Sequence, residues 1–213
     1  MFEDQPASIV PSTPIPEIAM GLALISMVVT YGTLDLDAMV KWQSGLLLGA
    51  VPAWGIFVQP LAFVFFLTAS IAENKRIPFD LPEAESELVA GYFTEYTSMK
   101  MGLFMLSEFI EIVVISALVV TLFLGGYNLP YLTDAGFAFP GGATWSLSHI
   151  TVVVLQVVTF AVKTFIVGCF QIQIRWTLPR FRYDQLMAFG WKILLPLAAV
   201  NLVVTVVLRW VML

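Results

Sequence analysis

The sequence predicts an all-α membrane protein: a polytopic helix bundle with about five transmembrane helices and one charged cytoplasmic loop. Three observations lead to this fold class. The 213 residues are 59% hydrophobic and only 12% charged, well below the roughly 25% charged residues of soluble domains. The mean hydropathy is +0.90. The apolar residues also gather in runs of about the length that a helix needs to cross a bilayer.

Five apolar runs are long enough to be considered as membrane spans, at about residues 17–32, 46–72, 101–124, 150–174 and 186–213. Prolines at positions 6, 11, 14 and 16 disfavour a regular helix before the first run. We therefore expect an irregular N-terminal leader over residues 1–16 and a single transmembrane domain over residues 17–213. Pro52 and Pro60 interrupt the second run, which predicts either a kinked helix or a broken helix that lines a cavity.

The basic residues predict the orientation. Most of them fall in or beside the second and fourth connectors: Lys75, Arg76, Lys100, Arg175, Arg180, Arg182 and Lys192. The positive-inside rule then places the acidic loop over residues 73–100, and the later PRFRYDQ segment, in the cytoplasm. The C terminus is expected on the opposite, periplasmic side.

Several classes of function are disfavoured. The net charge of −5 comes from clustered carboxylates, which argues against binding of nucleic acid. The single cysteine, Cys169, allows no intrachain disulfide. There is no phosphate-binding loop, no CxxC pair and no Ser/His/Asp set, so no catalytic residue is predicted.

The loop between Glu73 and Glu95 is the first candidate functional segment, because it carries six acidic and two basic side chains between two apolar runs. Ionisable groups at or within a membrane often mark a path for protons, ions or a ligand. Its alternating Glu83, Glu85 and Glu87 favour an acidic mouth where protons or a polar headgroup enter. A solvated acidic loop is the alternative, and a metal site is disfavoured because nothing fixes a coordination geometry.

Glu108 and Glu111 stand three residues apart in MLSEFIEIVV, on one face of the third predicted helix. A charge at bilayer depth is costly, so both carboxylates are expected to face the interior of the bundle, with Glu108 buried. Such a pair suits proton uptake and release. A structural pair that is hydrogen-bonded to a neighbouring helix remains the alternative.

Lys163 lies in the fourth run together with Gln156, Gln171 and Gln173, which makes one face of that helix polar. We expect Lys163 to pair with a carboxylate of the third helix and so to extend the polar line across the membrane. A purely structural ion pair between the helices is the alternative.

Two long blocks resemble one known family. ENKRIPFDLPEAESELVAGYFTEY, followed by a helix with SEF that ends in TLFLGG, resembles the signature of the quinone-channel membrane subunit of respiratory complex I, the H-type subunit of NADH-quinone oxidoreductase and the homologue of mitochondrial subunit 1. IRWTLPRFRYDQLMAFGWKILLPLA resembles the last cytoplasmic loop and final helix of that family, and EIAMGLALI resembles the start of a middle helix. The resemblance covers about residues 17–213.

The resemblance implies a role in coupling quinone reduction to proton pumping in a bacterial inner membrane, with quinone as the substrate of the complex, no cofactor or redox centre in this chain, and other membrane and peripheral complex I subunits as partners. The residues implied or inferred for the proton path are Glu17, Glu73, Glu83, Glu85, Glu87, Glu95, Glu108, Glu111 and Lys163. Those implied for the quinone cavity are Arg76, Pro78, Phe79 and Asp80, while Arg175, Arg182 and Asp184 match other charged positions.

The family pattern includes about three further helices before the one that begins near Glu17, which leads us to expect that this chain encodes only one side of the quinone cavity. Three other interpretations stay open. The chain could be the homologous membrane subunit of an energy-converting hydrogenase, although PFDLPEAESELVAGYFTEY favours the quinone enzyme. It could be an inactive fragment. A stand-alone transporter is disfavoured because no inverted repeat is visible.

Overall fold

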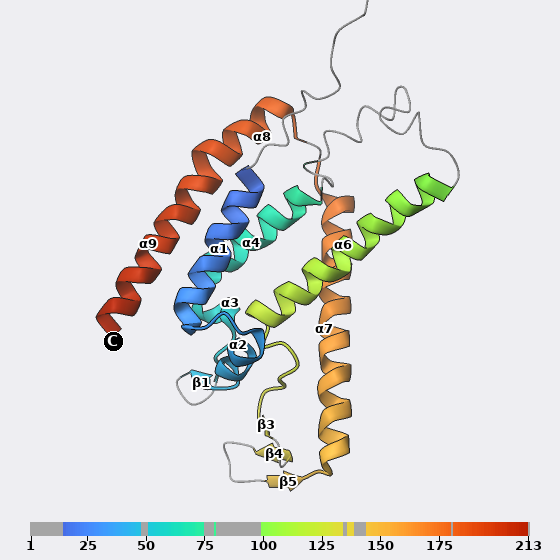
Figure 1. Cartoon of the computed structure of the whole chain (residues 1–213), viewed down its shortest axis with the longest axis vertical. Helices are drawn as coiled ribbons and strands as arrows, with labels where there is room; N and C mark the ends of the chain where they lie inside the picture. Colours follow the sequence, from blue (N-terminus) through green and yellow to red (C-terminus); the bar gives the residue numbers. More distant parts are fainter. Residues whose placement is uncertain are drawn as a thin grey trace, which may run out of the picture.

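The computed structural model describes residues 15–47, 51–74, 79, 99–133, 136–138, 144–179 and 181–212. Within these ranges the chain is a bundle of helices with two very small sheets (Figure 1), so the predicted all-α membrane fold is confirmed. The helices are α1 (Ile15–Tyr31), α2 (Leu36–Gln43), α3 (Gly55–Val58), α4 (Pro60–Glu73), α6 (Met99–Phe123), α7 (His149–Thr177), α8 (Tyr183–Phe189), the π-helical segment η2 (Gly190–Leu194) and α9 (Leu195–Met212).

Three described helices are long and apolar enough to cross a membrane: α6, α7, and the continuous helix over Gln185–Val211 that joins α8, η2 and α9. A fourth span results if α1 and α2, which are bent by 62° relative to each other, are counted together. The remaining apolar helix, α4, is shorter. The five predicted runs therefore all contain helix, but they differ in how much of the bilayer each could cross.

The prediction of one long second helix, kinked or broken over residues 46–72, is wrong for its first half. Strand β1 (Leu46–Leu47) pairs antiparallel with β2 (Val51–Pro52), and the short helix α3 separates this hairpin from the break at Gln59. The prolines explain the difference. Gln59 precedes a proline and leaves the helical region, with φ −136° and ψ 65°. Pro60 then begins α4, at a position where a missing N–H costs nothing.

Two further elements were not predicted. Helix α2 begins after Asp35, whose carboxylate accepts a hydrogen bond from the Asp37 amide at 3.1 Å, a common way to satisfy the free amides of a helix start. On the same end of the molecule, β3 (Leu132–Thr133), β4 (Gly136–Ala138) and β5 (Thr144–Ser146) form an antiparallel sheet in that order (Figure 1). Both lie in the connectors between the predicted apolar runs.

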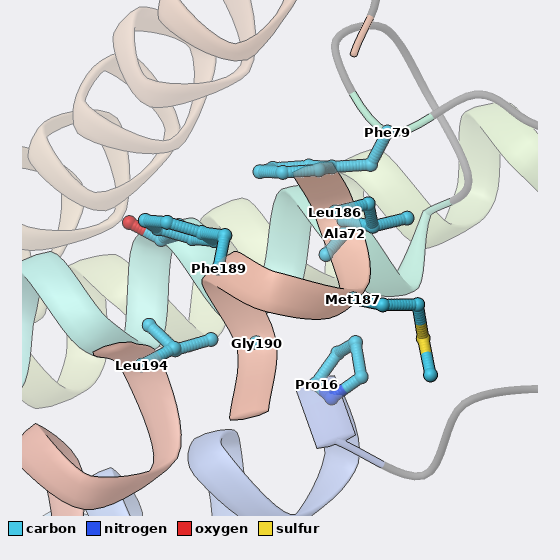
Figure 2. A pocket seen from close by; sticks show the side chains of 9 residues that line it. Pro16, Ala72, Phe79, Leu186, Met187, Phe189, Gly190 and Leu194 are labelled. Atoms are coloured by element: carbon cyan, nitrogen blue, oxygen red, sulfur yellow. The ribbon is translucent and has the colours of Figure 1, made fainter. Parts of the chain in front are cut away.

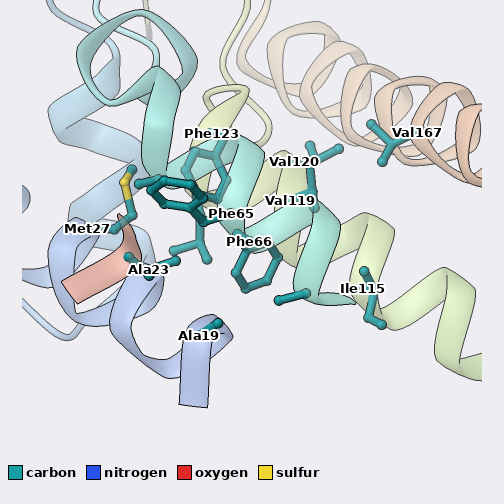
Figure 3. Close-up of a cluster of buried hydrophobic side chains, with 14 of the residues drawn as sticks. Ala19, Ala23, Met27, Phe65, Phe66, Ile115, Val119, Val120, Phe123 and Val167 are labelled. Atoms are coloured by element: carbon teal, nitrogen blue, oxygen red, sulfur yellow. The ribbon is translucent and has the colours of Figure 1, made fainter. Parts of the chain in front are cut away.

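The hydrophobic core lies between α1, α4 and α6 (Figure 3). Helix α1 contributes Ala19, Ala23 and Met27, all almost fully buried. Small residues of this kind let two helices approach closely in a membrane protein. They face the phenylalanines of α4, and Phe66 packs on Phe123 of α6 with ring centroids 5.6 Å apart.

The outer faces of α6, α7 and α9 expose many large apolar side chains, among them Phe165 of α7 and Val203 of α9.

Polar contacts hold the break between α3 and α4 against the neighbouring helices. At the break, Gln59 Nε2 donates to Thr30 Oγ1 of α1 at 3.1 Å and to Thr205 Oγ1 of α9 at 2.8 Å. Polar bonds of this kind between helices replace the water that the bilayer excludes.

Candidate functional site

The predicted acidic residues divide into three groups. Glu17 is exposed in the first turn of α1, and Glu73 is half-buried as the last residue of α4. Glu108 and Glu111 are both half-buried on α6. The acidic residues of the loop lie outside the described residues, as do most of the positions predicted for the quinone cavity: Glu83, Glu85, Glu87, Glu95, Arg76, Pro78 and Asp80. Between residues 75 and 98, Phe79 is the one described residue.

Glu108 and Glu111 lie on the side of α6 that turns toward the other helices. The next residues along this side, Ile112 and Ile115, are buried, whereas Phe109 on the adjacent side is exposed. Glu108 is thus less enclosed within this chain than the burial that we predicted. Its position between the buried and the exposed side of α6 agrees with a carboxylate that faces away from lipid.

A cavity of about 200 Å³ opens beside this part of α6. The residues that line it come from α4, its C-terminal cap, α6 and α7: Ile71, Asn74, Phe109, Ile112, Gln171, Ile172, Arg175 and Trp176. Phe109 and Ile112 directly follow Glu108 and Glu111 in the sequence, and Asn74 directly follows Glu73. The cavity therefore adjoins the segments that carry three of the predicted acidic positions, although none of those three side chains lines it.

Buried polar side chains connect the three helices around this cavity. Asn74 Nδ2 lies 3.4 Å from Gln171 Oε1, and Gln171 Nε2 donates to Ser116 Oγ at 3.0 Å. Ser116 donates in turn to the Ile112 carbonyl at 2.7 Å. Within the part of the chain that the structure describes, the buried Asn74 Oδ1 has no hydrogen-bond donor. The three side chains form a polar bridge from the end of α4 through α7 to α6.

Lys163 does not pair with a carboxylate of the third helix, so that prediction is wrong. Its ammonium donates to three backbone carbonyls at and just after the end of α6, those of Leu124 at 2.8 Å, Gly126 at 3.1 Å and Asn128 at 2.7 Å. It also lies 4.8 Å from the centroid of the Trp54 ring. The last carbonyls of a helix have no partner within the helix and attract cations, which explains why a lysine serves here without a carboxylate.

Phe79, predicted for the quinone cavity, is buried against α8 (Figure 2). Its ring lies 5.7 Å from that of Phe181 and 6.3 Å from that of Phe189. The space beside it, lined also by Pro16 and Met187, measures about 20 Å³, which is room for about one water molecule. In this arrangement Phe79 connects the loop after α4 to the start of the last helix.

Comparison with known proteins identifies the family. The family model described as NADH dehydrogenase matches residues 13–206. The chain belongs to the NADH dehydrogenase family. Its curated relatives include H-type subunits of NADH-quinone oxidoreductase from Cytophaga hutchinsonii, 43% identical over 89% of this chain, and from Geobacter metallireducens, 46% identical over 89% of it. NADH-quinone oxidoreductase subunit 8 of Rhodothermus marinus is 40% identical over 88% of the chain.

This NADH dehydrogenase family member spans about half the length of the curated relatives that it matches, 51% of the Cytophaga protein and 49% of the Geobacter protein. The match confirms the resemblance carried by the acidic-loop block and the PRFRYDQ block. Together with the apolar helices, it establishes the chain as a membrane protein.

The polar bridge was missed at the sequence level, although part of its signal is visible there. Gln171 stands out as one of several glutamines in an apolar run, but the sequence shows no partner for it. Ser116 gives little signal, because a serine in a membrane helix commonly bonds to its own backbone. Asn74 is inconspicuous among the charged residues that surround it.

Proposed function

We propose that this chain serves as part of the H-type membrane subunit of a proton-translocating NADH-quinone oxidoreductase. In this role it forms one part of the quinone cavity and an acidic path that couples quinone reduction to proton pumping. The observation that carries the proposal is the 40–46% identity, over nearly nine-tenths of the chain, to proteins named as subunits of that enzyme.

The proposed proton path uses the acidic residues of the loop and of α6. Its members are Glu17, Glu73, Glu83, Glu85, Glu87, Glu95, Glu108, Glu111 and Lys163. Half-burial of Glu108 and Glu111 on α6 supports this role, as does the cavity that the following residues Phe109 and Ile112 line. A carboxylate in such a place can take up and release a proton without crossing lipid. Lys163 bonds to backbone carbonyls, so its part in the path is to hold the end of α6 in place.

The proposed quinone contacts are Arg76, Pro78, Phe79 and Asp80, on the loop that follows α4. Phe79, the one described residue of the four, lines the separate space of about 20 Å³. The cavity of about 200 Å³, lined by Asn74 and Arg175 among others, combines apolar walls with a few polar groups. Such a lining is typical of sites for largely apolar ligands with a polar head. Quinone enters this scheme as a substrate of the whole complex, and electrons reach it from redox centres in other subunits.

The proposed partners are therefore the other membrane subunits and the peripheral subunits of the complex, in a bacterial inner membrane. We propose that the loop over residues 73–100 faces the cytoplasm and contacts the soluble subunits. The excess of Lys and Arg around this end of the bundle supports that orientation. Crosslinks from residues 74–92 to a peripheral subunit would be the expected result, whereas crosslinks to periplasmic proteins alone would invert the topology.

The decisive test is Glu108→Gln in the assembled complex. Glutamine keeps the size and the hydrogen bonding of the side chain but cannot titrate. We expect proton translocation per electron to fall sharply while the complex still assembles. Asp35→Asn is the matched control, since it removes one exposed carboxylate at the opposite end of the bundle and asparagine caps a helix equally well. Unchanged coupling in Glu108→Gln would refute the assignment.

A further inference from the structure

Helix α7 is joined to α6 by two polar side chains whose spacing is the same on both helices. Lys163 and Gln171 stand eight residues apart on α7 and contact Leu124 and Ser116, which stand eight residues apart at the end of α6 and within it. The order is reversed between the helices, as an antiparallel pair requires. We call these two contacts, Lys163 to the Leu124 carbonyl and Gln171 to Ser116, the α6–α7 clamp.

Equal spacing fixes how far one helix can slide along the other. Eight residues correspond to about 12 Å of helix rise, and a shift by one turn would move every contact by about 5.4 Å. A hydrogen bond is lost over much smaller displacements. Lys163 Nζ lies 2.8 Å from the Leu124 oxygen and Gln171 Nε2 lies 3.0 Å from Ser116 Oγ. A slide of α7 by one turn would therefore break the Gln171–Ser116 contact and carry Lys163 away from Leu124, although Gly126 and Asn128 are further acceptors for the ammonium.

Gln171 also reaches a third helix. Its Oε1 faces Asn74 Nδ2 at 3.4 Å, at the residue that directly follows Glu73. On the other side, Ser116 bonds to the carbonyl of Ile112, the residue that directly follows Glu111. Asn74, Gln171 and Ser116 are all buried, at 9%, 8% and 0% exposure. One amide side chain thus joins the two segments that carry Glu73 and Glu111.

We propose that Gln171 is a positioning residue, which holds the acid-bearing end of α4 and the acid-bearing half of α6 at a fixed depth against α7. The inference rests on the proposed function, since it assigns Gln171 to the proposed proton path. The amide does not titrate and carries no proton itself. Its effect is geometric: it keeps the segments that carry Glu73 and Glu111 in constant positions relative to each other.

The test compares Gln171→Leu with Gln173→Leu in the assembled complex. Gln173 undergoes the same chemical change two residues away, on an exposed side of α7, so it controls for the loss of an amide. The first measurement is the distance between spin labels at exposed Leu106 on α6 and exposed Thr177 on α7, in a Cys169→Ala background. The second is the number of protons translocated per electron.

In Gln171→Leu we expect a second, displaced distance population to rise by about fivefold, because two buried hydrogen bonds between helices are lost. Proton translocation per electron should fall in parallel, and Gln173→Leu should match the unmodified protein in both measurements. If the variant fails to assemble, Gln171→Asn provides the same comparison, since it keeps the amide but shortens its reach.

Each other combination of results overturns the proposal. Unchanged distances would show that Gln171 does not set the register, whatever happens to coupling. A changed register with unchanged coupling would show that this position of the acids is not needed. Glu108→Gln, measured alongside, separates the two hypotheses: if it leaves pumping intact, the proton path fails, while the distance measurement still decides whether the clamp exists.

Discussion

The Lys163 ammonium on α7 lies 2.8 Å from the carbonyl oxygen of Leu124 at the end of α6. Two other helices supply polar side chains to the same helix end. Tyr31 Oη of α1 donates to the Leu122 carbonyl at 2.7 Å, and Gln43 Nε2 of α2 donates to that of Thr121 at 2.9 Å. Three carbonyls at and just after the C terminus of α6 are thus paired by side chains of α1, α2 and α7.

Lys163→Met should therefore destabilise the chain. Methionine preserves most of the side-chain length but removes the donor, which leaves three carbonyls without the ammonium. We expect a loss of about 2 kcal/mol in the free energy of unfolding, measured by denaturant titration in mixed micelles. Lys192→Met makes the same chemical change at an exposed position and should have little effect. Equal stability of the two variants would show that the carbonyls need no cation.

Gln43→Leu should have a comparable effect for a different reason. Gln43 is fully buried, and its Oε1 accepts from the amides of Gly55 at 3.1 Å and Gly125 at 2.9 Å. Leucine fills the space but leaves these amides unpaired, which costs about 1–3 kcal/mol. Thermal unfolding should shift to lower temperature in Gln43→Leu and remain unchanged in the exposed Gln173→Leu.

Gly125→Ala tests the turn that ends α6. Gly125 has a positive φ of 74°, and a Cβ there would lie 2.7 Å from Nε1 of Trp54. We expect a cost of about 1–3 kcal/mol from backbone strain together with the clash. Gly102→Ala, within α6 itself, is the control, because nothing lies within 4 Å of its Cβ. That substitution should raise stability by up to about 1 kcal/mol. A neutral Gly125→Ala would mean that Trp54 moves freely.

Phe79→Ala should weaken the attachment of the loop to α8. The change removes the ring that packs on Phe181 and Phe189. Amide hydrogen exchange over residues 183–189 should become faster, because those amides lose the cover of a buried aromatic ring. Phe57→Ala serves as the control, since Phe57 is 57% exposed. Exchange rates that do not change in Phe79→Ala would show that the aromatic contacts contribute little to the start of the last helix.

Hydropathy alone was enough to assign the membrane class, because a long apolar run in lipid must satisfy its own backbone and a helix does so. The same pattern located α6, α7 and the last helix to within a few residues. The two charged blocks were enough to recognise the resemblance to the family. The prolines were visible as interruptions of the second run. Whether Pro52 and Pro60 would produce a kink or a hairpin followed by a new helix depended on the pairing of β1 with β2, which no local pattern encodes.

Which polar groups meet became clear only once the helices were packed together. Lys163 could be recognised as a cation within an apolar run, but its partners are carbonyls that lie 35–39 residues earlier. Every residue has a backbone carbonyl, so the sequence does not show which ones accept from Lys163. Gln171 likewise gains its significance only from Asn74 and Ser116, which two other segments bring beside it. The physical reason is that hydropathy and charge pattern set the environment of each residue, whereas hydrogen-bond partners depend on the register and depth at which the helices pack.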